Sequence, residues 1–269
     1  MTTPGRESEG RGSQARASHP RDRSKKSAAD YRRDLETLED WDTYLRSRSG
    51  LPGPRGNLEL LAVVAETGTA AQFARWAALS TDDAPTNTPG EFLVACGVVG
   101  HGRLAAEGKP LSVTLLRRWA NDSRWRVREA TAMCLQRVGD ADPAALVALA
   151  KPLARGSALE RRAAVAGLCE PRLLVDKRVR SGAFAALSSA TKWLRALPPE
   201  ERRHPDVRTL RQSLGYAWSV AVAADPRAGI PRFEALCEDI DPDVRWIARE
   251  NLKKSRLHRA APALVQRYR

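Results

Sequence analysis

The chain has 269 residues, of which 42% are hydrophobic and 29% charged, a composition that supports one large core or two small ones. No stretch approaches the roughly 20 uninterrupted apolar residues of a membrane span, and the N-terminus lacks the apolar core of a signal peptide. No membrane partner is therefore expected, and the expected location is cytoplasmic. The formal net charge of +13 favours a polyanionic partner, either nucleic acid or an acidic protein. Arginine-rich faces that are simply solvated would give the same net charge.

The N-terminal part of the chain divides into a tail and a short helical segment. Residues 1–29 are rich in Ser, Arg and Gly and nearly lack large apolar side chains, which predicts a disordered polar tail. An amphipathic run begins at Asp30, and the sequence LPGPRG at 51–56 interrupts it. Residues 30–56 are therefore predicted to form one helix followed by a Pro/Gly linker.

Residues 57–269 show the pattern of helices alone. Their apolar residues come in Ala- and Leu-rich runs of about ten to twenty residues, without the short alternating stretches of strands. Paired helices joined by short turns at a period of about 35 to 45 residues predict an all-α fold, a right-handed α-solenoid that fills 57–269. Two capping boxes and three Asp-Pro pairs mark helix starts, at Thr88 with Glu91, Ser157 with Glu160, Asp142-Pro143, Asp225-Pro226 and Asp241-Pro242.

The four cysteines carry a structural rather than a chemical signal. They form no CxxC pair, and no HExxH motif is present, so neither a metal site nor a disulfide framework is predicted, and no cofactor is expected. Their intervals of 38, 35 and 68 residues fit one small buried residue per repeat. Reduced thiols in the core are predicted for Cys96, Cys134, Cys169 and Cys237.

An octet occurs twice in the chain. DSRWRVRE at 122–129 returns as DVRWIARE at 243–250, keeping Asp, Arg, Trp, Arg and Glu in order. On a helical wheel, the apolar residues of each copy gather on one side, and Trp125 and Trp246 stand opposite, among polar groups. Each copy is therefore predicted to present a tryptophan beside arginine and glutamate, away from the core.

The two copies lie in longer stretches that resemble a known repeat. NDSRWRVREATAMCLQRVGD and DIDPDVRWIARENLKK resemble the second helices of HEAT repeats, in which a turn acid precedes a Val-Arg pair and then small and leucine positions. Val127-Arg128 and Val244-Arg245 carry the match, and the resemblance covers most of residues 57–260. It implies a HEAT-like stack of helix pairs, which defines a shape and no particular reaction.

Three interpretations of the displayed indoles remain open. In the first, the rings pack on neighbouring repeats and the arginines pair with turn acids. In the second, the inner surface of a non-catalytic binding module contacts a partner, either nucleic acid or an acidic protein, by stacking and charge. The second interpretation assigns the contacts to Trp119, Arg124, Trp125, Arg128, Arg245, Trp246, Arg249 and Lys253.

The third interpretation is an enzyme. In fold, basic charge and the placement of Trp, Asp and Arg on one helix, the chain resembles the alkylpurine DNA glycosylases built from HEAT-like repeats. That resemblance implies alkylation repair, with Trp119, Trp125 and Trp246 as the lesion-contacting rings and Asp122 as the carboxylate. An N-cap role at a helix start also accounts for Asp122. No extended stretch of the sequence reproduces a glycosylase signature. The main prediction therefore remains a binding module without catalytic residues, and nucleic acid is its favoured ligand.

Overall fold

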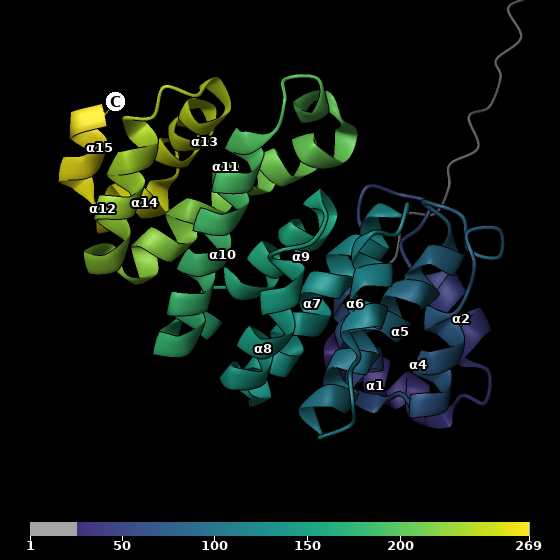
Figure 1. The fold of residues 1–269 in the computed structure, drawn as a ribbon. Coiled ribbons are helices and arrows are strands. Elements are labelled where there is room, and N and C mark those ends of the chain that lie inside the picture. The colour runs from purple at the N-terminus through teal and green to yellow at the C-terminus, as the bar shows by residue number, and fades with distance from the viewer. Residues whose placement is uncertain (1–25, 269) are drawn as a thin grey trace, which may run out of the picture.

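The computed structural model describes residues 26–268, and these residues form fifteen α-helices and two 3-10 helices without a strand (Figure 1). The all-α prediction is confirmed, and most of the predicted tail lies outside the described residues. The α-helices are α1 (Ala28–Thr37), α2 (Trp41–Arg48), α3 (Leu58–Thr67), α4 (Ala70–Ala77), α5 (Pro89–Ala106), α6 (Val113–Ala120), α7 (Trp125–Ala141), α8 (Pro143–Leu153), α9 (Ala158–Leu168), α10 (Lys177–Ala196), α11 (Pro205–Ala224), α12 (Pro226–Cys237), α13 (Pro242–Leu252), α14 (Ser255–Ala260) and α15 (Pro262–Tyr268), and the 3-10 helices are Leu173–Val175 and Glu201–Arg203.

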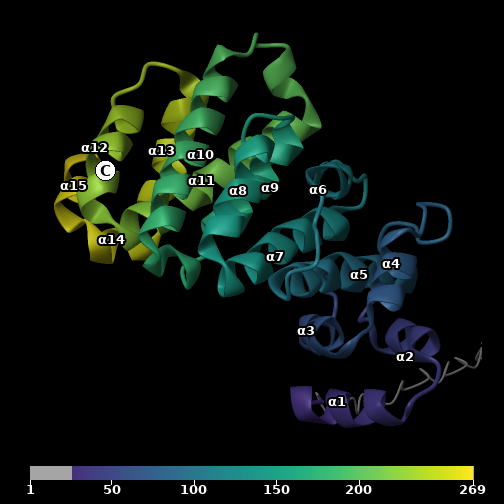
Figure 2. The same cartoon turned by 60° about the horizontal axis from the view of Figure 1, so that its bottom comes forward.

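The helices stack in chain order. A central row is formed by α3, α5, α7, α9, α11 and α13, each packed on the next, while α4, α6, α8, α10 and α12 each pack on their central partner. The chain therefore advances from α1 at one end of the stack to α15 at the other (Figures 1 and 2). This is the HEAT-like helical-repeat architecture that the Val-Arg signature predicts.

The N-terminal segment differs from its prediction. It forms two helices, α1 and α2, rather than one, because Asp40 caps a new helix through the backbone N–H groups of Asp42 and Thr43. The first helix starts at Ala28, two residues before the predicted start. Both helices pack on the stack, and the Trp76 indole donates a 2.8 Å hydrogen bond to Asp42.

The predicted helix starts are largely confirmed. Asp142, Asp225 and Asp241 each accept hydrogen bonds from backbone N–H groups of the first turn that follows, and proline is the first residue of all three helices. Ser157 caps α9 through the Glu160 N–H at 3.2 Å, but the predicted box is not closed, because the Glu160 carboxylate accepts from the Asn121 amide instead. The capping box predicted for Thr88 and Glu91 does not form: the Thr88 side chain accepts no hydrogen bond from the first turn of α5.

The fourth member of that box, Glu91, is instead a buried link between helices. Its carboxylate accepts a 2.7 Å bond from the Asn87 N–H and bonds from the backbone and guanidinium of Arg126, at 3.1 and 3.2 Å. Three donors compensate the loss of water around a fully buried carboxylate. Glu91 thus fixes the start of α5 to the start of α7.

Helix α5 has the longest unbroken run of buried residues among the described helices. Every residue from 90 to 100 is buried, and α2, α3, α4 and α7 pack around the helix. Gly102 permits the closest approach, since a Cβ there would lie 2.5 Å from the Cys134 carbonyl oxygen of α7. The two helices can therefore pack backbone against backbone at this point.

The cysteines lie in the core as predicted, with Cys96, Cys134 and Cys169 buried and Cys237 half-buried, all as free thiols. Burial raises the pKa of the Cys134 and Cys169 thiols to about 12. Among the described residues, no helix is both long and apolar enough to cross a membrane. Within the same part of the chain, no three His, Cys, Asp or Glu side chains gather as a metal site would need.

Candidate functional site

Arg124 differs from its prediction, because it is a buried structural residue rather than a surface cation. Only 4% of it is exposed. Its guanidinium donates to the carbonyl oxygens of Leu79, Ser80 and Ala84 at 3.0 to 3.2 Å and binds Asp122 through two further nitrogens. These bonds satisfy carbonyls in the loop after α4, so the guanidinium is not available to a phosphate.

Asp122 serves the same structure. One carboxylate oxygen accepts from the Arg124 N–H at 2.8 Å and from its Nε at 2.9 Å, and the other accepts from its Nη2 at 2.7 Å. The residue at the N-cap position of α7 is Arg124, so Asp122 holds the turn before the helix rather than capping the helix itself. Both oxygens of the carboxylate that the glycosylase resemblance singles out are thus engaged by one arginine.

Arg128, the arginine of the Val-Arg signature, also binds backbone. It is the fourth residue of α7 and donates to the carbonyl oxygens of Asp122 at 2.7 Å and Ser123 at 2.8 Å. Arg161 and Arg180, the fourth residues of α9 and α10, bond to the turns before their own helices in the same way. Burial lowers the pKa of Arg128 and Arg161. Arginine at the fourth position thus ties the starts of α7, α9 and α10 to the turns that precede them.

Trp119 also differs from the prediction of a displayed ring. It is 3% exposed, lies on the buried side of α6, and packs against His101 with ring centroids 5.3 Å apart. Burial lowers the pKa of His101. A ligand at the surface therefore has no access to the Trp119 ring.

Trp125 is displayed, as predicted from the helical wheel. Its residue is 49% exposed at the start of α7, and the Arg126 guanidinium lies 5.6 Å from the centroid of its ring. The ring forms one wall of an apolar cavity of about 300 Å³ between α3 and α7, whose other apolar walls are Leu58, Leu61, Phe92 and Met133. Apolar walls fit an apolar side chain better than a phosphate.

Trp246 is only partly exposed. The Arg211 guanidinium covers its ring at 4.5 Å from the centroid, and Arg211 is itself paired with Asp243. The ring also approaches Gly215 of α11, where an added Cβ would lie 3.0 Å from its Cζ3 atom. Because α9 and α11 separate α7 from α13 in the central row, the two echoed tryptophans do not share one site.

The remaining predicted cations do share one surface. Arg245, Arg249 and Lys253 recur every four residues and are all exposed, so they form one stripe along α13 that ends at its C-cap residue, Lys253. Arg245 and Arg249 form no ion pair with any described residue, whereas Lys253 pairs with Glu250.

Tyr216, whose ring contacts the cations that follow this stripe in the chain, is a residue that the sequence analysis missed. It is 48% exposed on α11, with the Arg256 guanidinium 4.2 Å and the Lys254 ammonium 5.7 Å from the centroid of its ring. The tyrosine hydroxyl also accepts a hydrogen bond from Arg256. Its signal in the sequence is the polar spacing of Arg208, Gln212 and Tyr216 along α11. We call the set Tyr216, Arg245, Arg249, Lys253, Lys254, Arg256 and Arg259 the C-terminal basic surface.

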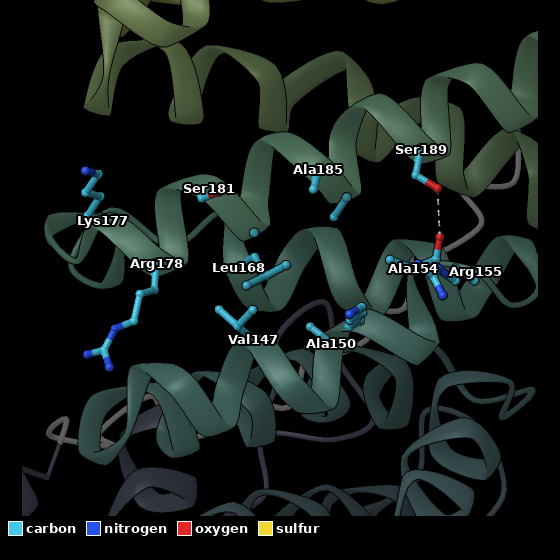
Figure 3. Close-up of a pocket in the computed structure, with 13 residues that line it drawn as sticks. Val147, Ala150, Ala154, Arg155, Leu168, Lys177, Arg178, Ser181, Ala185 and Ser189 are labelled. Atoms are coloured by element: carbon cyan, nitrogen blue, oxygen red, sulfur yellow. Dashed lines mark hydrogen bonds between the residues drawn. The ribbon is translucent and has the colours of Figure 1, made fainter.

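A second surface feature is a groove between α8 and α10 with a volume of about 690 Å³ (Figure 3). Its floor is apolar and made mainly of small residues, with Val147 and Leu168 as the largest. Lys177 and Arg178 lie at one end of the groove, and Arg155 lies toward the other end (Figure 3).

Comparison with known proteins assigns the chain to no family. No family model matches the chain, and no curated protein sequence matches it. Among solved structures, it is similar to a designed armadillo repeat protein, YIII(Dq)4CqI, at 15% sequence identity and a TM-score of 0.37, with 83% of this chain and 97% of that chain covered. The fold therefore rests on the stacking of helix pairs described above, and stacks of this kind build the extended surfaces of binding modules.

Proposed function

We propose that the chain is a non-catalytic binding module whose C-terminal basic surface binds the phosphate backbone of nucleic acid. The observation that carries the proposal is the exposed Tyr216 ring, which has the Arg256 guanidinium 4.2 Å and the Lys254 ammonium 5.7 Å from its centroid. A ring in this setting offers a stacking surface to a base, while neighbouring cations contact successive phosphates.

The distribution of charge supports the same surface. From Arg245 to Arg269 the sequence holds eight Lys or Arg and one acid, Glu250. Of the six cations between residues 245 and 259, only Lys253 forms an ion pair within the described chain. Arg124 and Arg128, in contrast, are engaged with backbone carbonyls. The C-terminal end of the stack therefore carries a local excess of cations that form no ion pair with any described residue.

The alkylation-repair alternative has less support. Asp122 is saturated by Arg124, and Trp119 is buried, so two of the groups that this alternative requires are engaged in the fold. Release of free base from alkylated DNA by the wild-type chain, lost in Asp122→Asn, would favour the enzyme over the binding module.

The binding proposal is tested by fluorescence anisotropy with labelled single-stranded and duplex oligonucleotides over a salt series. If about four phosphates are contacted, affinity should fall roughly 100-fold between about 50 and 200 mM salt, because binding releases counterions. Arg249→Glu should weaken binding. It should also reduce the slope of log affinity against log salt concentration by about one for each phosphate contact that is lost. Arg118→Glu is the matched control, since Arg118 is an exposed cation of α6 that forms no ion pair with any described residue.

Tyr216 separates stacking from simple charge attraction. Tyr216→Ala should weaken single-stranded binding by roughly 5- to 100-fold, the range that loss of one stacked base gives, and should leave the salt slope unchanged. Absence of binding to any strand, or equal affinity in Arg249→Glu and wild type, would contradict the proposal.

A further inference from the structure

The α8/α10 groove is long enough to hold a helix. Lys177 and Ser189 both line it, and they are separated by twelve residues of α10, which corresponds to about 18 Å along the helix axis. That length accommodates roughly three helical turns. Small residues make most of the floor, namely Ala150, Ala154, Gly182, Ala185 and Ala186.

The ionisable residues around this floor all carry positive charge. They are Lys151, Arg155, Lys177 and Arg178, all exposed, and the lining within the described chain includes no carboxylate. Of the four, only Arg178 forms an ion pair in the described structure, with Asp176 at 2.9 Å. Three cations therefore border the groove without a partner.

We infer that the α8/α10 groove binds an acidic amphipathic helix of a protein partner. The apolar face of such a helix would cover the alanine and valine floor, and its carboxylates would meet the bordering cations. This inference concerns a different surface from the C-terminal basic surface and does not depend on nucleic-acid binding.

A helix fits this floor better than an extended peptide does. An extended segment needs backbone partners, but the floor consists of helix backbone and apolar side chains, and the Ala154 carbonyl already accepts from Ser189 at 3.2 Å and from Arg161 at 2.6 Å. A bound helix satisfies its own backbone and brings only side chains to the floor. A nucleic-acid duplex would engage the cations but leave the apolar floor without a complementary surface.

The neighbouring groove between α10 and α12 provides an internal contrast. It shares Lys177, Ser181 and Ala185, but its lining includes Asp225, which pairs with Arg180, and the aromatic ring of Phe184. Its charge is therefore partly neutralised within the chain. The uncompensated charge distinguishes the α8/α10 groove as the surface for an acidic partner.

The inference is tested with a fluorescein-labelled helical peptide of about 16 residues that carries leucine and alanine on one face and glutamate on the other. We expect saturable binding to the full chain that weakens as salt rises, and at least tenfold weaker binding of the same peptide with lysine in place of glutamate. Ala185→Trp should reduce affinity at least tenfold, because the indole would occupy the groove. Ala148→Trp, at an exposed position of α8 outside the lining, is the matched control.

The charge is tested by Lys177→Glu, which should weaken binding of the acidic peptide, with Arg118→Glu as the equal change of charge on α6. Circular dichroism on every variant verifies that the helical stack is intact. Equal binding of both peptides, or unchanged affinity in Ala185→Trp, would overturn the inference. Loss of oligonucleotide binding, rather than peptide binding, in Ala185→Trp and Lys177→Glu would assign the groove to nucleic acid and also overturn it.

Discussion

Trp125 is the first residue of α7, whereas Trp246 is the fifth residue of α13. The echoed octet is therefore displaced by four residues, about one helical turn, between the two helices. The Val-Arg signature keeps its register instead, since Val127 and Val244 are both the third residue of their helices. The displacement accounts for the different surroundings of the two rings: Trp125 lies at the open end of its helix, and Trp246 lies one turn deeper, beside Gly215 and Arg211.

This difference predicts unequal stability effects. Trp246→Ala should lower the free energy of unfolding by roughly 2 kcal/mol, because the ring packs on α11 and covers apolar area there. Trp125→Ala should cost less than about 1 kcal/mol, since half of that residue is already exposed. Urea unfolding followed by circular dichroism measures both, and a larger loss in Trp125→Ala would contradict the assignment.

Arg124 should be among the most sensitive polar positions. Arg124→Met removes the guanidinium bonds to three carbonyls and leaves the Asp122 carboxylate with only the backbone N–H of residue 124, so a loss of about 3 to 5 kcal/mol in unfolding free energy is expected. Arg118→Met, at an exposed position on α6, should change stability by less than about 0.5 kcal/mol. Similar denaturation midpoints for the two variants would show that the buried bonds of Arg124 contribute little.

Two glycines make a second matched pair. Gly102→Ala would place a Cβ 2.5 Å from the backbone oxygen of Cys134, so it must separate α5 from α7 and should destabilise the chain by about 3 kcal/mol. At Gly182 a Cβ would meet only side-chain atoms of Val147 and Leu168, at 3.3 to 3.5 Å. Gly182→Ala should therefore remain within about 1 kcal/mol of wild type, helped by the better helix propensity of alanine. Thermal melts of both variants test the difference, and equal melting temperatures would argue against close α5/α7 packing.

The cysteines should be unreactive in the folded chain. Burial raises the pKa of Cys134 and Cys169 to about 12, and burial with Glu234 and Glu238 nearby raises that of Cys237 to about 12 as well. At about pH 8 only roughly one thiol in ten thousand would be a thiolate, which is the reactive form. An aromatic disulfide reagent should titrate all four thiols rapidly in guanidinium chloride and none rapidly in buffer. A native thiol that reacts within seconds would refute this placement.

The sequence was sufficient to predict the stack because its main signals are local. Helical periodicity around Val127, Asp-Pro starts such as Asp241-Pro242, and regularly spaced cysteines each depend on one helix or one repeat. The environments of Arg124 and Trp119 were not predictable in this way. Arg124 is buried by carbonyls some 40 residues earlier, and Trp119 by His101 of another helix, so a wheel drawn for one helix contains neither partner.

For Tyr216, the sequence shows that the residue is exposed but not which residues surround it. Its spacing with Arg208 and Gln212 marks an exposed stripe of α11, but the cations that flank its ring come from α14 and the turn before it, 38 and 40 residues later. Composition indicated that positive charge gathers near the C-terminus, and only the packing of α14 on α11 shows which aromatic ring meets that charge.

The burial of residues 90–100 of α5 gives the stack two unlike ends. A repeat array held only by its neighbours can unravel from either terminus, but here four helices surround one buried hub near the start of the chain. Erosion by a protease, or unravelling under mechanical load, should therefore begin at α15 and proceed helix by helix until it reaches α7. The remaining part, α5 with the helices packed around it, would then unfold as one cooperative unit.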